Sequence, residues 1–351
     1  MKSIFGSVKN QQKLNLPFVL YKKPSSKIII GVFPKEEHLY FSDDLSERGF
    51  VFAPFSGLPI VFPIEKSKIE YGNIDGQHTK IDSNELTVFD ESQAAHFKEI
   101  VAKAIAIMKE GEMDKIVLSR KEIINLNRFD LEEVFTTIVF KYSSAFCYCW
   151  YHPEIGLWLG ATPEKLFSAD GATFKTMALA GTQSYSGTEN VVWNSKEIQE
   201  QEFVTDFIVE KLKNQTDSLS ISETYTTRAG DLLHLRTDIE GQLTKTANLK
   251  KVIDILHPTP AVCGLPNDLA KAFILANENY DREFYTGFLG EINMDVLKNK
   301  TATDLFVNLR CMKIRNTQAQ LFVGCGVTKE SDPDAEWKET CHKAKTMKQV
   351  L

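Results

Sequence analysis

Features that would tie a protein to membranes or nucleic acid are missing from this sequence. No apolar run reaches the roughly 20 residues that a membrane-spanning helix needs, and the stretch KIIIGVF at residues 27–33 has only the length of a strand. The formal net charge is -6, and no long run of lysine and arginine occurs. An acidic chain without a basic tract is a poor match for nucleic acid or an anionic membrane surface. We therefore expect neither as a partner.

Cysteine is sparse and follows no redox or metal-binding pattern. The six cysteines form no CxxC pair, and most lie in apolar or strand-like surroundings. The first residues, MKSIFGSVKNQQKLNL, show no signal-peptide pattern. We therefore expect free, buried thiols in a reducing compartment, and we predict a cytoplasmic protein.

What the sequence does contain is the composition of an ordinary globular protein, with 43% hydrophobic and 25% charged residues in a chain of 351. This length allows one large domain or two. Short strands and turns are predicted over the first ninety residues, and a helix follows that Gly111 is placed to end. Further helices are predicted near 131–141 and 195–213, with hairpins between them and a polar loop at 214–222. This mixture predicts an α+β layered fold and not a regularly wound βαβ sheet.

Two pairs of glutamates lie three residues apart in predicted helices. Glu336 and Glu339 follow the glycine-rich strand end GCGV, and Glu197 and Glu200 lie in SKEIQEQEFVTDFIVEKL. A spacing of three places the members of each pair on one helix face. Glu197 and Glu200 also continue the apolar stripe of their helix, which is the face that turns toward a core.

Such pairs are most often solvated helix surface. A carboxylate aligned with a buried stripe needs a partner, however, because burying an isolated charge is costly. Four converging carboxylates would need a cation, and an all-oxygen ligand set without His or Cys suits Mg²⁺. The spacing leaves both alternatives open, solvated surface or a magnesium site.

Two further charged residues have an ordinary and a functional interpretation. Lys115 begins the predicted strand KIVLSRKEI, where a lysine is usually exposed. If it is buried near a metal, its ammonium form is disfavoured and it can act as a general base. Glu164 in GATPEKLF falls at a predicted turn or first helical turn, where the helix dipole alone would favour it. Its functional interpretation is a carboxylic acid that donates a proton.

The candidates for anion binding are one arginine, two glycines and one histidine. Arg310 in VNLRCMKI is predicted in mid-strand among apolar residues, where a guanidinium needs an internal or a ligand carboxylate. Gly324 and Gly326 would let a ligand approach backbone amides closely. His234 in LLHLRTDIEG is either a satisfied core residue or a ligand contact, and its spacing alone favours the core.

Taken together, these segments resemble one family, the chorismate-utilising enzymes. The family includes isochorismate synthase, salicylate synthase and the large subunits of anthranilate and aminodeoxychorismate synthases. The resemblance covers about Gln93 to the C-terminus, and the first ninety residues match only loosely. The matching motifs occur in the family order: KIVLSRK, GATPEKLF, ALAGT, SKEIQEQEFV, HLRTDIEG, LHPTPAVCGLP, DREFYTGFLG, VNLRCMKI and GCGVTKESDPDAEWKET.

The resemblance implies a fold and a reaction. The fold is a single large domain of mostly antiparallel sheets with helices packed around and between them. Residues 1–92 would form a β-rich N-terminal part of it and residues 93–351 the chorismate-binding catalytic region. Lys115 would be the general base that activates water for attack at C2 of chorismate. Glu164 would be the acid that protonates the departing C4 hydroxyl.

The resemblance also implies a cofactor site and a substrate pocket. Glu200 and Glu339 correspond to direct ligands of Mg²⁺, and Glu197 and Glu336 to acids that support it through water. The family usually has His where this chain has Gln201, so we expect different hydrogen bonding around the metal. Mg²⁺ would hold the ring carboxylate of chorismate. The residues implied to contact the substrate or line its pocket are Gly181, Thr182, His234, Ala261, Tyr285, Arg310, Gly324, Gly326 and Lys343.

Two alanines distinguish between members of the family. Ala180 stands where aminodeoxychorismate synthases have a nucleophilic lysine, which leaves water as the nucleophile. Ala261 stands where pyruvate-releasing members commonly have Thr. The resemblance therefore implies isochorismate synthase activity, with a salicylate synthase and a catalytically silent binding protein as alternatives. We expect a monomer without an amidotransferase subunit, and both menaquinone and siderophore synthesis stay open as destinations of the product.

Overall fold

The computed structural model describes residues 2–74 and 91–351, and its first strand, β1 (Phe18–Lys22), shows how the sequence builds the fold. All five residues of β1 are buried. Phe18 and Leu20 belong to the core beneath two helices, whereas Val19 and Tyr21 belong to a different core on the opposite face. Because side chains alternate along a strand, a strand buried on both faces lies between two layers.

The first of two large sheets contains nine of the described strands. They are β1, β2 (Ile28–Pro34), β6 (Ser67–Asn73), β7 (Lys115–Asn125), β8 (Phe146–His152), β9 (Gly156–Thr162), β15 (Gly264–Leu265), β18 (Cys311–Arg315) and β19 (Gln318–Thr328). Their spatial order is β15-β7-β19-β18-β9-β8-β1-β2-β6. The longest pairing joins β7 to β19 and runs from Lys115 opposite Thr328 to Asn125 opposite Gln318.

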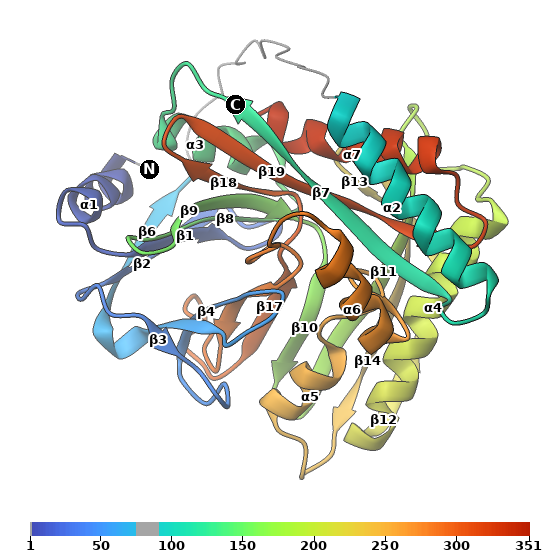
Figure 1. Ribbon diagram of the computed structural model, residues 1–351. Helices are drawn as coiled ribbons and strands as arrows, with labels where there is room; N and C mark the ends of the chain where they lie inside the picture. The colour runs from blue at the N-terminus through green and yellow to red at the C-terminus, as the bar shows by residue number, and fades with distance from the viewer. Residues whose placement is uncertain (1, 75–90) are drawn as a thin grey trace.

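The second sheet packs against the first (Figure 1). Its strands are β3 (Tyr40–Phe41), β4 (Gly49–Ala53), β5 (Ile60–Pro63), β10 (Lys165–Asp170), β11 (Thr173–Ser184), β12 (Thr216–Ile221), β13 (Tyr225–Ala229), β14 (Leu232–Leu243), β16 (Phe288–Ile292) and β17 (Thr303–Val307). The order is β12-β14-β11-β10-β17-β16-β4-β5-β3, and β13 pairs with β14. All pairings between described strands are antiparallel, so the predicted α+β fold of mostly antiparallel sheets is confirmed.

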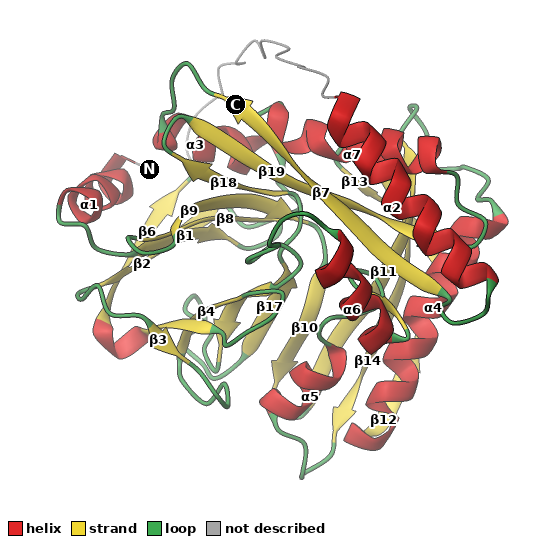
Figure 2. Cartoon of the chain, in the orientation of Figure 1, coloured by secondary structure: helices red, strands yellow, loops and turns green. Residues whose placement is uncertain are grey.

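Helices cover the outer faces of both sheets (Figure 2). The helices α1 and α3 lie on the first sheet, α4 and α5 on the second, and α2, α6 and α7 pack around β7 and β19. None of the described helices is long and apolar enough to cross a membrane. The bounds are α1 (Lys2–Lys13), α2 (Glu91–Lys109), α3 (Leu131–Lys141), α4 (Ser195–Leu212), α5 (Leu249–Leu256), α6 (Asn267–Asn277) and α7 (Pro333–Lys348), with short 3-10 helices at Ile64–Lys66 and Lys213–Gln215.

Two sequence expectations were wrong. The first ninety residues are not only strands and turns, because α1 forms at the start of the chain and buries Ile4 and Val8 at a spacing of four against the first sheet. The segment 214–222 is not a loop throughout, because its centre forms β12. β12 is mostly exposed and polar, so its main-chain pairing with β14 and not a hydrophobic pattern makes it a strand.

Aromatic side chains fill much of the space between the two sheets, and we call this cluster the aromatic core. Within it, the rings of Phe52 and Phe284 stack at 4.2 Å and those of Trp158 and Phe322 at 5.0 Å. Such pairs contribute both large buried area and a preferred geometry. The members are Tyr21, Phe50, Phe52, Phe62, Phe146, Tyr148, Trp150, Trp158, Phe284, Tyr285, Phe306 and Phe322.

The chain passes between the sheets at two links that matter for the site. β9 of the first sheet ends at Thr162 and β10 of the second begins at Lys165, so residues 163–164 cross between them. β17 of the second sheet ends at Val307 and β18 of the first begins at Cys311, so residues 308–310 cross back. Both links place side chains at the junction of the two sheets.

Candidate active site

A cavity at the junction of the sheets brings most of the predicted site residues together. Its apolar wall includes Val117, Leu179, Leu309 and Phe322. The predicted residues that line it are Glu164, Gly181, Thr182, Glu200, His234, Ala261, Tyr285, Arg310, Gly324, Gly326 and Lys343. The other four predicted residues, Lys115, Glu197, Glu336 and Glu339, are not part of this lining, although Lys115 contacts Glu200 and Glu339 contacts Lys343.

Lys115 is the first residue of β7, and its side chain is completely buried. The ordinary interpretation of an exposed strand-end charge is therefore wrong. Its Nζ lies 3.2 Å from Glu200 Oε1, an ion-pair contact. Burial lowers the pKa of Lys115, while the charges of Glu200 and Glu164 act in the opposite direction. The result is a lysine whose ammonium form is less favoured than usual.

Glu164 occupies the link between β9 and β10, so it is not in a first helical turn. The residue is 4% exposed, and burial raises the pKa of its carboxyl to about 8. Lys115 and Lys343 lower this pKa but do not outweigh burial. A carboxylic acid in this environment keeps its proton at neutral pH and can donate it.

Glu200 follows the inward stripe that the sequence predicts for α4, since it is buried together with Val204 and Ile208. Burial alone would raise its pKa, but the charges of Lys115 and Lys196 outweigh burial and lower it. Gly326 provides the space for this carboxylate, because a Cβ at that position would lie only 2.0 Å from Glu200 Oε1. The glycine therefore accommodates a side chain of the protein itself.

Lysine side chains form ion pairs with two of the acids, Glu336 and Glu339. Lys196 Nζ on α4 lies 2.5 Å from Glu336 Oε1 on α7, and Lys343 Nζ lies 2.6 Å from Glu339 Oε1. Lys343 also donates to Gly324 O at 3.0 Å. Burial raises the pKa of Glu336, opposed by Lys196 and reinforced by Glu339. The Lys196–Glu336 pair therefore joins α4 to α7, whereas the Lys343–Glu339 pair lies within α7.

The carboxylate oxygens of the acid pairs are the type of ligand that a hard divalent ion prefers, but the side chains are not arranged as a complete metal site. Among residues 2–74 and 91–351, no three His, Cys, Asp or Glu side chains lie close enough together to hold a metal. Glu197 Oε2 and Glu336 Oε2 are nevertheless buried without a hydrogen-bond partner. Buried carboxylate oxygens need a donor or a cation. Oxygen ligands of this kind suit Mg²⁺.

A bulge in the pairing of β11 with β14 shapes the opposite wall. The register shifts between Ala180 and Gln183, and Gly181 takes a positive φ of 69°. His234 on β14 hydrogen bonds through Nδ1 to Gly181 O at 2.8 Å. Burial and the charge of Arg310 lower the His234 pKa to about 3, so the imidazole is neutral and Nδ1 carries the proton that it donates.

Arg310 lies in the link between β17 and β18 with a φ of 47°, so the prediction of a mid-strand position is wrong. Its guanidinium contacts Thr346 Oγ1 at 3.2 Å and His234 Nε2 at 3.3 Å. Both partners are neutral. The guanidinium therefore faces the cavity with its charge available for an anionic ligand.

Gln201 does not take the place of a histidine beside the acids. Its Nε2 donates to Ala178 O and to Thr237 Oγ1, both at 3.1 Å, on the strands that α4 covers. The side chain thus ties α4 to β11 and β14. The expected change in hydrogen bonding around a bound metal stays a prediction.

The sequence interpretation missed a buried ion pair behind the cavity wall. Arg282 donates to both carboxylate oxygens of Glu278, and also to Val117 O at 2.7 Å and Val262 O at 3.0 Å. Glu278 in turn accepts from the backbone and hydroxyl of Ser119 on β7. The pair therefore joins the strand that carries Lys115 to the loop beside Ala261. A charged residue in the motif DREFYTGFLG is the signal that could have pointed to it.

The chain has recognisable relatives among known proteins. A family model described as chorismate binding enzyme matches residues 64–351. Isochorismate synthase EntC of Escherichia coli K12 is 30% identical over 265 residues, which span 73% of this chain and 66% of EntC. Isochorismate synthase MenF of Haemophilus influenzae is 29% identical over 351 residues, which span 94% of this chain and 72% of MenF.

A solved structure supports the fold. The crystal structure of DhbC from Bacillus anthracis has a TM-score of 0.79 and 22% sequence identity, and the likeness covers 98% of this chain and 99% of that one. At this identity the likeness concerns the fold alone. The cavity described above therefore lies in a fold shared over nearly the whole chain.

Proposed function

Since this chain belongs to the chorismate binding enzyme family, we propose that it converts chorismate to isochorismate. The reaction adds the hydroxyl of a water molecule at C2 of the ring and expels the hydroxyl at C4, and the enolpyruvyl ether is retained. The relatives named above are isochorismate synthases. The protein would thus be an isomerase that acts on a small dicarboxylate.

One observation carries the proposal: two buried groups that can transfer protons lie at the same site, with Glu164 in the cavity lining and Lys115 in contact with Glu200, which also lines it. The Lys115 pKa is lowered by burial, and the Glu164 pKa is raised by burial to about 8. Burial disfavours the charged form of both groups, which is how proteins tune a lysine to accept a proton and a carboxylic acid to donate one. Lys115 is therefore assigned to take a proton from the attacking water, and Glu164 to give one to the leaving C4 oxygen.

The remaining polar groups are assigned to the substrate's two carboxylates. Arg310 would bind the pyruvyl carboxylate through its guanidinium, because its hydrogen-bond partners in the structure, Thr346 and His234, are neutral. Glu200 and Glu339 would hold Mg²⁺, supported by Glu197 and Glu336. When bound, the ion would neutralise the ring carboxylate and stabilise charge that develops during the reaction.

The reaction is tested by incubating the protein with chorismate, with Mg²⁺ or with excess chelator, and separating the products by chromatography. We expect isochorismate to accumulate with Mg²⁺ and no conversion with chelator. Salicylate plus pyruvate would identify a salicylate synthase instead. Unchanged chorismate under all conditions would leave only a binding role.

The pH dependence of turnover follows from Glu164. Its carboxyl must be protonated to act as an acid, so we expect kcat to fall as pH rises through about 8, where this group loses its proton. The measurement is kcat at saturating chorismate between pH 6 and pH 10. Glu164→Gln should remove this alkaline limb from whatever residual activity remains. An identical limb in Glu164→Gln would assign it to another group.

A further inference from the structure

One lysine between the acidic helices has no task in the reaction proposed above. Lys196 lies in the first turn of α4, and its side chain is 19% exposed. Its Nζ contacts Glu336 Oε1 at 2.5 Å, and the side chain of Glu336 is only 1% exposed. The charge of Lys196 also acts on Glu200 and Glu339. One ammonium group therefore faces acids from both α4 and α7.

The position of Lys196 differs from that of the other two lysines near the acids. Lys115 and Lys343 each hold one carboxylate and are assigned to the reaction or line the cavity. Lys196 is not part of the cavity lining and instead joins α4 to α7. Its contact is thus between the two helices and not with the substrate region.

Two carboxylates of the acid pairs each have a buried oxygen without a hydrogen-bond partner. Oε1 of Glu336 forms the ion pair with Lys196, whereas Oε2 of Glu336 is buried without a hydrogen-bond partner. Glu197, the neighbour of Lys196 in sequence, has an equally unpartnered buried Oε2. Converging carboxylates repel one another and need positive charge, and a single ammonium supplies only part of it.

We propose that Lys196 is a positioning residue that stands in for the divalent cation. In the metal-free chain its ammonium holds the acid pairs of α4 and α7 together, and the ion takes over this charge when it binds. The inference rests on the proposed magnesium site. It means that metal binding is an exchange of one cation for another, because ion and ammonium repel each other in the same group of acids.

The exchange predicts two opposite effects of removing the ammonium. Lys196→Met keeps the length of the side chain and deletes its charge. Without metal, the acids of the two helices repel, so we expect Tm in the presence of chelator to fall by roughly 3 °C. With the competing cation gone, we expect the Kd for Mg²⁺ to fall about tenfold, the lower end of what residues around a metal site contribute. Mg²⁺ should then raise Tm more in the variant than in the wild type.

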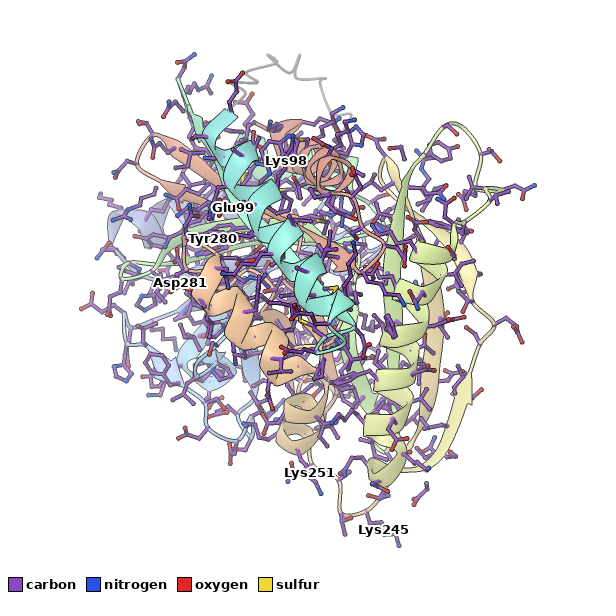
Figure 3. All side chains as sticks on the ribbon, turned by 45° about the vertical axis from the view of Figure 1, so that its right-hand side comes forward. Lys98, Glu99, Lys245, Lys251, Tyr280 and Asp281 are labelled. Atoms are coloured by element: carbon purple, nitrogen blue, oxygen red, sulfur yellow. The ribbon has the colours of Figure 1, made fainter. Side chains whose placement is uncertain are left out.

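The measurements are calorimetric titration of the metal-free protein with MgCl₂, without chorismate, and thermal unfolding with and without Mg²⁺. Lys196→Arg keeps the charge and should retain a Kd near that of the wild type. Lys98→Met is the matched control, since Lys98 on α2 (Figure 3) pairs with Asp334 at the exposed start of α7. We expect no change in Mg²⁺ affinity for this control.

The outcomes separate the inference from the function on which it rests. Mg²⁺ affinity that Lys196→Met leaves unchanged or weakens would overturn the inference alone. If the wild type binds no Mg²⁺, the proposed metal site fails and the inference fails with it. A Lys196→Met protein that folds only with Mg²⁺ present would support the exchange, because the ion then replaces the missing charge.

Discussion

Replacing Lys115 by alanine is expected to lower kcat for isochorismate formation by about 10²–10⁴-fold, the usual contribution of a general base. Lys115 Nζ lies 3.2 Å from Glu200 Oε1, which lines the cavity, and burial lowers the pKa of Lys115, which favours its neutral amine more than in a free lysine. No other lysine in the site is buried to this degree. The measurement is the rate of isochorismate formation at saturating chorismate, with circular dichroism to check the fold.

Lys22 offers a matched control for this substitution. Its side chain is also buried, but it donates to the carbonyl oxygens of Ser143 and Ala145, away from the cavity. Lys22→Met should therefore lower stability and leave the kcat of the folded protein close to the wild-type value. Turnover by Lys115→Ala near the wild-type rate would remove the lysine from the mechanism.

Glu164→Ala should show a loss of kcat of the same order as Lys115→Ala, because it deletes the assigned acid.

Adding one methyl group at Gly326 is expected to abolish most activity while the protein stays folded. A Cβ there would lie 2.0 Å from Glu200 Oε1 and 2.6 Å from its Cδ. The clash falls on the end of a flexible side chain, so the carboxylate can turn away without a backbone shift, although losing its buried contact with Lys115 should lower Tm. A displaced Glu200 would no longer face Lys115 or serve a metal. We expect Mg²⁺ affinity in Gly326→Ala to weaken by about 10–100-fold.

The control for this prediction is another strand glycine that has room for a side chain. A Cβ at Gly72 in β6 would meet Ile4 at 3.4 Å, an ordinary contact. Gly72→Ala should therefore bind Mg²⁺ as the wild type does. The measurements are calorimetric Mg²⁺ titration and Tm for both variants. Wild-type Mg²⁺ binding by Gly326→Ala would show that Glu200 is not needed at the metal.

Sequence patterns predicted the elements whose signals are local. Local sequence patterns predicted the helices α2, α3 and α4 and the strand β7. The inward direction of Glu200 followed from its place on the apolar stripe of α4. The resemblance of nine motifs added the grouping of Lys115 and Glu164, which lie 49 positions apart in the sequence and which spacing alone cannot bring together.

The parts that failed depend on contacts far apart in the chain. Arg310 looked like a strand residue because its neighbours are apolar, but the chain changes sheets there and Arg310 takes a positive φ. β12 has no hydrophobic alternation, and it forms a strand because its main chain pairs with β14. The cross-helix contact of Lys196 with Glu336 spans 140 residues and could not be inferred from either helix by itself.

The aromatic core between the sheets reaches into the cavity itself. Tyr285 lines the cavity and its ring stacks on Phe322 at 5.7 Å, and Phe322 in turn stacks on Trp158. The links that carry Glu164 and Arg310 cross the same interface. The separation of proton donor and anion anchor is therefore a property of how the two sheets dock. Substitutions that repack this interior, even far from any reacting atom, will change reaction rate together with thermal stability.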